Sequence, residues 1–158
     1  MASYVERVLQ PGETVRYEGT LHWIIFLPAF VLLAFGIVGL AVMVVEPGTG
    51  RGANIFSIIV GLAFLFGVLH LISAWIRRMA TEIAVTNHRI IYKTGLISRR
   101  TVEMNMDKVE SVDVTQDIFG RLLDYGTVTI RGTGAGLEPL VTINSPIALR
   151  NAITVGSS

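Results

Sequence analysis

The sequence contains no cysteine, which excludes disulfide bridges and thiolate metal sites. Charge is also scarce: 16% of the residues are Asp, Glu, Lys or Arg, and the formal net charge is +1. Because proteins that bind nucleic acid usually present a strongly basic face, this balance argues against nucleic acid as a partner. The histidines, His22, His70 and His88, are too dispersed along the chain to predict a metal site.

Charge is missing altogether from two long apolar runs, Leu21–Val45 and Ile55–Ile76. Each run exceeds the roughly 20 helical residues that cross a bilayer core. Between them, Glu46–Asn54 contains Pro47 and three glycines, a composition typical of a tight turn. We therefore predict a transmembrane hairpin of two antiparallel helices.

The hairpin divides the chain into three parts: a membrane-flanking segment at 1–20, the hairpin at 21–76 and a domain at 77–158. The last part is long enough for one small folded domain. Arg77 and Arg78 follow the second run directly, whereas the turn holds one basic residue. By the positive-inside rule, both termini are expected in the cytoplasm.

Short β-type segments fill the domain. Thr127–Arg131 alternates most clearly, which predicts that Val128 and Ile130 point into the core. Asp117 is a candidate cap for a short helix that ends at Gly126. Strands are predicted at 81–86, 88–94, 99–106, 108–115, 127–131 and 140–144.

A C-terminal helix completes the expected domain. Ser145 is a good helix N-cap residue, and Pro146 fits the first helical position. A single sheet of six strands cannot bury both faces, so it should curl into an antiparallel β-sandwich or half-barrel closed by this helix. The expected fold class is α+β.

Two segments resemble the bacterial pleckstrin-homology-like (PH-like) domain family. They are AVTNHRIIYKTGLISRR at 84–100 and IFGRLLDYGTVTIRGTG at 118–134, with MDKVESVDVTQ at 106–116 between them. The resemblance implies a PH-like fold placed directly after a pair of membrane helices. It also implies a multi-pass protein of the bacterial cytoplasmic (inner) membrane.

Four basic residues are candidate ligands for anionic lipid headgroups: Arg77, Arg78, Arg89 and Lys93. Basic residues close to a membrane surface gain about 1 kcal/mol each from anionic lipid. The alternative is that Arg77 and Arg78 only set the topology and the others are solvated. The connection Thr86–Arg89 is too short to hold the multi-arginine phosphate cage of phosphoinositide-binding PH domains.

Small residues recur along the second apolar run, and such residues let membrane helices approach closely. Ala53, Ser57 and Gly61 form one set at a spacing of four residues, and Ala63 and Gly67 form a second set on nearly the opposite face. One set can pack against the first helix, which leaves the other for a neighbouring chain. The alternative is that small residues are simply common in membrane helices. The candidate oligomer interface comprises Ala53, Ser57, Gly61, Ala63 and Gly67.

His70 is the one ionisable residue well inside a predicted span, which makes it a functional candidate by default. The alternative is a neutral structural histidine. Pro28 removes a backbone hydrogen bond and frees the carbonyl of Ile24. We expect His70 to lie at the same depth and to donate a hydrogen bond to that carbonyl.

Together these features predict a non-catalytic, membrane-anchored PH-like module that scaffolds or assembles proteins at the cytoplasmic face. It is expected to act as a homo-oligomer or as an accessory subunit of a membrane complex. The alternative is binding or sensing of anionic lipid. The sequence presents no nucleophile–base set and suggests no cofactor, so an enzyme is not predicted.

Overall fold

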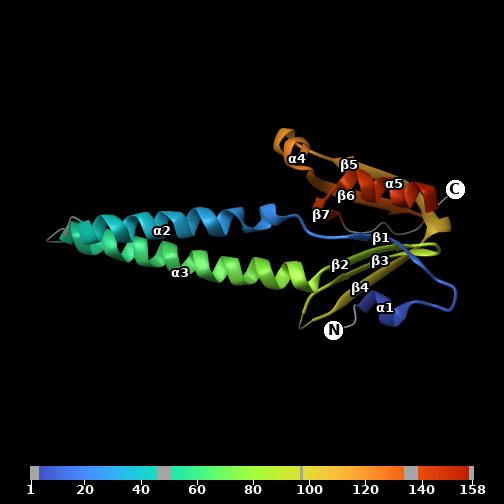
Figure 1. Cartoon of the computed structure of the whole chain (residues 1–158), viewed down its shortest axis with the longest axis horizontal. Coiled ribbons are helices and arrows are strands. Elements are labelled where there is room, and N and C mark those ends of the chain that lie inside the picture. The colour runs from blue at the N-terminus through green and yellow to red at the C-terminus, as the bar shows by residue number, and fades with distance from the viewer. Residues whose placement is uncertain (1–3, 46–50, 97, 134–138, 157–158) are drawn as a thin grey trace. The chain divides into compact units, whose positions relative to one another are not determined.

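The computed structural model describes residues 4–45, 51–96, 98–133 and 139–156, and the chain divides into two compact units. One unit combines residues 1–22 with residues 77–158, and the other is residues 23–76. The order of elements, two long apolar helices followed by antiparallel strands and a short C-terminal helix, confirms the predicted α+β class (Figure 1).

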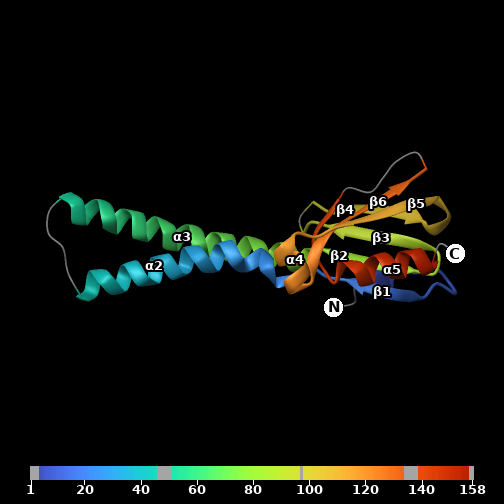
Figure 2. The same ribbon diagram turned by 90° about the horizontal axis from the view of Figure 1, so that it is seen from above.

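The helical unit consists of a 3₁₀ turn, η1 (Trp23–Phe26), followed by α2 (Leu27–Val45) and α3 (Arg51–Ala80), which lie side by side in both views (Figures 1 and 2). Both helices are long and apolar enough to cross a membrane. Only 22% and 11% of their most apolar windows are buried, so the two helices leave most of their apolar surface uncovered. An uncharged surface of this extent fits lipid better than water.

The helix boundaries differ from the predicted ones. The first helix starts at Leu27, six residues later than predicted, and α3 begins inside the expected turn and extends to Ala80. Pro28 explains the first difference, because proline is tolerated in the first turn of a helix, where its missing N–H would have no intrahelical partner. Leu21 instead forms a β-bridge with Ile143 and belongs to the folded domain.

The domain contains two antiparallel sheets. The first has the strand order β1-β2-β3-β4 and the second the order β5-β6-β7. The strands of the first are β1 (Val15–Gly19), β2 (Glu82–Thr86), β3 (Arg89–Thr94) and β4 (Arg100–Asn105). Those of the second are β5 (Val109–Thr115), β6 (Tyr125–Gly132) and β7 (Leu140–Asn144).

Short helices complete the domain. They are α1 (Tyr4–Val8), η2 (Met106–Lys108), α4 (Ile118–Leu123) and α5 (Pro146–Gly156). The last of these contacts β1 and β2 of one sheet and β5 and β6 of the other, so it closes the space between the sheets (Figure 1). This is the bent sandwich with a capping helix that the sequence predicted.

The core lies between the sheets and α5. Val128 and Ile130 are fully buried, as predicted from the alternation of β6, and Ile83, Leu149 and Ile153 are buried with them. Such side chains supply the apolar burial that stabilises a domain of this size.

Polar residues mark the ends of α4 and α5. Asp117 does cap α4, accepting a hydrogen bond from the Gly120 N–H, but α4 ends at Leu123 rather than at Gly126. Asp124 terminates it in the left-handed conformation, at φ 56° and ψ 48°, which aspartate tolerates better than most residues. Ser145 directly precedes α5, as predicted for its N-cap, and its carbonyl accepts the Ala148 and Leu149 N–H groups, whereas its hydroxyl donates to Asp124 Oδ2 at 2.6 Å.

Strand β1 was not predicted. It pairs with β2 from Val15↔Thr86 to Gly19↔Ile83, so residues treated as a membrane-flanking segment supply an edge strand of the domain. Its burial alternates along VRYEG, with charged residues on the outer face. The whole helical unit is thus inserted between two neighbouring, paired strands of one sheet.

Candidate functional site

Arg89, a predicted headgroup ligand, is held inside the domain by carboxylates. Its Nε and Nη2 donate to the two oxygens of Glu13 at 3.0 and 2.9 Å, and its Nη1 donates to Glu103 Oε2 at 2.8 Å. Nη2 also donates to the carbonyl of Val8 at 2.8 Å. Only 14% of the Arg89 side chain and 1% of the Glu13 side chain are exposed. The guanidinium therefore serves the domain's own packing.

Glu13 is the centre of this buried network. Its Oε1 accepts a hydrogen bond from Thr86 Oγ1 at 2.7 Å, and its Oε2 accepts one from the Gln10 N–H at 2.8 Å. Burial raises the pKa of the Glu13 carboxyl, but the hydrogen bonds from Gln10, Thr86 and Arg89 outweigh it and hold the pKa below its ordinary value. The ionised carboxylate thus ties the segment before β1 to the turn between β2 and β3.

Lys93, another predicted headgroup ligand, has a similar role. Its Nζ lies 2.5 Å from Glu82 Oε1 and 5.3 Å from the centroid of the Tyr4 ring. Glu82 in turn accepts a hydrogen bond from the Val5 N–H at 3.3 Å. Lys93 therefore helps to hold α1 on β2 and β3, where Val5 packs against Ala84.

Arg77 and Arg78 occupy a different setting from Arg89 and Lys93. Both are exposed residues of the last helical turn of α3, where cations interact favourably with the helix dipole. Of the four predicted ligands, these two are exposed, whereas Arg89 is half-buried and Lys93 is buried. Arg89 and Lys93, in contrast, form ion pairs with carboxylates of the domain.

Glycines form the contact between α2 and α3. A Cβ atom on Gly67 would lie 2.9 Å from Leu33 Cγ, and one on Gly36 would lie 2.9 Å from Phe64 Cβ. Both distances are shorter than normal van der Waals contact, so only glycine permits this approach. Gly67 therefore belongs to the hairpin contact.

The remaining small residues of the predicted interface do not make such close contacts with α2. A Cβ atom on Gly61 would meet no atom within 4 Å, so this position faces away from α2. Ala53, Ser57 and Ala63 are half-buried, and the Ser57 hydroxyl donates to the Ala53 carbonyl at 2.8 Å. Of the two predicted sets, the one containing Gly61 thus reaches an open face.

His70 does not make the predicted contact. It is an exposed residue of α3, and in the described part of the chain no hydrogen bond joins it to the Ile24 carbonyl. The prediction assumed that Pro28 breaks a helix and frees the Ile24 carbonyl, but Pro28 lies in the first turn of α2 and interrupts no helix. The ring has the setting of a polar side chain on an apolar helix surface.

His22 marks the point at which the chain leaves the domain. Its N–H donates to the Thr142 carbonyl at 2.8 Å, and its ring stacks on Tyr125 with centroids 5.3 Å apart. Burial lowers the pKa of this imidazole and outweighs the opposing influences of Leu123 and Asp124. The ring is therefore neutral near pH 7 and packs as part of the core, one residue before the first apolar helix.

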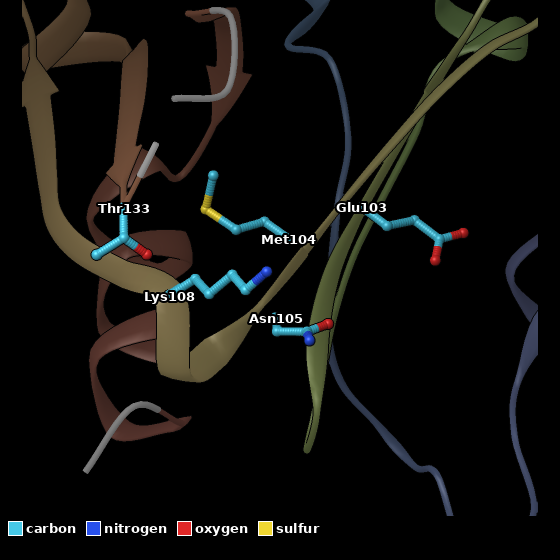
Figure 3. A pocket seen from close by; sticks show the side chains of 5 residues that line it. All are labelled: Glu103, Met104, Asn105, Lys108 and Thr133. Atoms are coloured by element: carbon cyan, nitrogen blue, oxygen red, sulfur yellow. The ribbon is translucent and has the colours of Figure 1, made fainter. Parts of the chain in front are cut away.

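A hollow of about 220 Å³ lies near the ends of β4 and β6 (Figure 3). Figure 3 shows Met104 and Lys108 extending into the space beside Thr133, whereas Glu103 points to the other side of β4, toward its partner Arg89. What remains is an amine, a hydroxyl and the Asn105 amide, which do not make a nucleophile–base pair. Within the described residues, no cluster of three or more His, Asp or Glu could hold a metal ion.

Comparison with known proteins identifies the family. The family model described as a bacterial PH domain matches residues 24–154, a stretch that includes both apolar helices and most of the domain. Neither the curated proteins nor the solved structures gave a match. The chain belongs to the bacterial PH domain family, which confirms the resemblance noted in its sequence, and PH domains are in general non-catalytic modules.

Proposed function

We propose that this member of the bacterial PH domain family is a non-catalytic module, anchored by its two apolar helices in the bacterial inner membrane. Its domain lies on the cytoplasmic face and assembles proteins there. Two positions tether the domain, one after β1 and one before β2, and they are adjacent because Gly19 pairs with Ile83. This double tether is suited to presenting a folded surface close to a membrane.

The pairing of β1 with β2 is the observation that carries the proposal. The chain leaves the first sheet after Gly19, forms α2 and α3, and returns at Glu82 to the strand beside the one it left. Strands paired in one sheet must lie on the same side of a bilayer, so both helices must cross it or neither does. Their length, their hydropathy and their largely uncovered surface favour crossing.

Cysteine labelling tests this topology, and the natural lack of cysteine removes background. Cysteine introduced by Thr49→Cys should react with a membrane-impermeant maleimide applied to intact cells. That introduced by Ser157→Cys should react only after the membrane is permeabilised, because Arg77 and Arg78 favour retention of that side in the cytoplasm. Labelling of both positions from outside, or of Ser157→Cys alone, would contradict the proposal.

We further propose that the module self-associates through the face of α3 that carries Gly61, since Gly67 is already used within the hairpin. Gly61→Ile should reduce the oligomer to a smaller species that stays folded, because it blocks close helix approach at an open face. Gly67→Ile should instead destabilise the hairpin, because the new side chain would overlap Leu33. Native mass spectrometry from mild detergent and thermal unfolding distinguish these results.

Two outcomes of this experiment would contradict the proposal. A wild-type protein that is monomeric after gentle extraction would count against self-association, and equal effects of the two variants would mean that the faces are wrongly assigned.

Binding of anionic lipid is the second candidate function, and the exposed pair Arg77 and Arg78 favours it. In that case the Arg77→Gln and Arg78→Gln substitutions should lower the amount of anionic lipid that the purified protein retains, and the oligomer mass should not change.

A further inference from the structure

Helix α4 presents large apolar side chains to the outside of the domain. Ile118, Phe119 and Leu122 are 84%, 66% and 78% exposed, and we call these three residues the α4 wedge. The residue that faces the domain is instead Gly120, where a Cβ atom would lie 2.6 Å from the Tyr125 carbonyl oxygen. This is the reverse of an ordinary surface helix, which turns its apolar side inward.

The wedge is held in this position by polar contacts at both ends. Asp117 caps the N-terminus, and Gln116 Nε2 donates to the carbonyls of Gly120 and Tyr125 at 3.1 and 3.0 Å. At the other end, Asp124 terminates the helix and bonds Ser145 at 2.6 Å. The apolar side chains are therefore displayed by a braced element.

The wedge also lies beside the point at which the chain leaves the domain. Tyr125, two residues after α4, stacks on His22, and the backbone of Leu123 is hydrogen-bonded to the same imidazole. The next residue, Trp23, begins the first apolar helix and is of a type that prefers the membrane interface. A six-residue helix is about 9 Å long, so all of α4 lies near this exit.

A further apolar side chain extends the same region. Val141 is 59% exposed and precedes Thr142, whose carbonyl accepts the His22 N–H. Val141 also lines a hollow together with Asp117, the cap of α4, and Tyr125. Exposed apolar side chains thus gather on the part of the domain from which the chain enters the first apolar helix.

We propose that the α4 wedge inserts into the interfacial layer of the bilayer in which the helices are anchored. Aliphatic and aromatic side chains on a short helix with a basic residue, here the exposed Arg121, are typical of segments that lie in the membrane interface. The covalent tether at His22 keeps the wedge at this surface, so insertion needs no separate recruitment step. Insertion provides a third attachment besides the two chain connections and fixes the domain's orientation on the membrane.

The proposal rests on the membrane anchoring proposed above, and depth-dependent quenching tests it in the intact protein. The Leu122→Cys variant is labelled with an environment-sensitive nitrobenzoxadiazole dye and reconstituted, at one copy per nanodisc, in phosphatidylcholine and phosphatidylglycerol. A second preparation contains doxyl-labelled lipid as a quencher. Because Leu122 is exposed in the domain, its replacement should leave thermal unfolding unchanged.

Val155→Cys provides the matched control. Val155 is also an exposed apolar residue, at 70%, and lies on α5. Its neighbour Gly156 lies beside Met106 and Arg16, at the start of β1, whereas His22 follows the end of that strand. The control label therefore lies near the start of β1, whereas the exit follows its other end.

We expect the Leu122 label to be blue-shifted and quenched several-fold more strongly than the Val155 label. Equal, weak quenching of both labels would overturn the proposal. So would a Leu122 label that becomes protected only when several copies share a nanodisc, because a second copy of the chain would then cover the wedge. Failure of the anchoring itself would appear separately, as a wrong labelling pattern at Thr49→Cys and Ser157→Cys.

Discussion

Replacing Glu13 by alanine is expected to lower the free energy of unfolding by about 3 to 5 kcal/mol, the usual cost of removing one partner of a buried ion pair. The variant leaves the guanidinium of Arg89, which is 14% exposed, without its bidentate acceptor. It also removes the side-chain acceptor of the Gln10 N–H and one of the two acceptors of the Thr86 hydroxyl, which keeps the Arg89 carbonyl at 2.9 Å. The loss can be measured by urea unfolding of the intact chain in mild detergent, monitored by β-sheet circular dichroism.

An exposed ion pair in the second sheet provides the control. Arg131 Nε lies 3.3 Å from Asp113 Oδ2, with side chains 68% and 55% exposed, so Asp113→Ala should cost less than about 1 kcal/mol. In the double variant of Glu13→Ala with Arg89→Met, the total loss should be smaller than the sum of the single losses, because no buried charge is left unpaired. Equal losses for Glu13→Ala and Asp113→Ala would refute the buried-network interpretation.

The same variant has a defined pH dependence. The pKa of Glu13 is lower in the folded domain than in the unfolded chain, where it is about 4.3. The contribution of this carboxylate to stability is therefore complete above that value and is lost as the pH falls through the folded pKa. The difference in stability between wild type and Glu13→Ala should be constant near neutral pH and shrink in acid.

Replacing Ile130 by alanine should cost about 2 to 5 kcal/mol, the range for truncating a fully buried isoleucine. Ile130 is 0% exposed and pairs with Val112 across the second sheet. The lost side-chain atoms leave a cavity that the neighbouring strands can fill only in part, because they are fixed by ladder hydrogen bonds. Urea unfolding under the conditions used for Glu13→Ala measures the effect.

The neighbouring position is the control. Thr129 lies on the opposite face of β6, is half-buried and pairs with Asp113, so Thr129→Ala should be close to neutral. If the two substitutions cost the same, the assignment of faces along β6 is wrong. If Ile130→Ala and Thr129→Ala both lost their β-sheet signal at neutral pH without denaturant, the assignment of faces would be wrong as well.

Elements whose signal is local could be predicted from the sequence. Charge-free runs predicted both helices, and alternation along Thr127–Arg131 predicted that Val128 and Ile130 are buried. Asp117 was recognised as a helix cap because its partner, the Gly120 N–H, lies three residues away. In each case the residues that determine the structure are neighbours in the chain.

Interactions between distant segments were missed. Strand β1 was overlooked because its short, half-charged sequence is stabilised by β2, on the far side of two long helices. Arg89 was taken for a surface cation because its acceptor, Glu13, lies 76 residues away. The contacts of Lys93 with Glu82 and with the Tyr4 ring were not predicted either, since they depend on strand pairing and on α1 folding back onto the sheet.

The sequence by itself determined that this chain has two helices apolar enough for a membrane and an α+β domain of the PH-like class, because hydropathy and periodicity are properties of neighbouring residues. Only the tertiary structure decided that the helices interrupt one domain between paired strands, that Arg89 and Lys93 form ion pairs within the domain, and that α4 turns its apolar side outward. Periodicity gives a helix its apolar residues but not the direction in which they face. That direction is set by packing against strands brought together from distant parts of the chain.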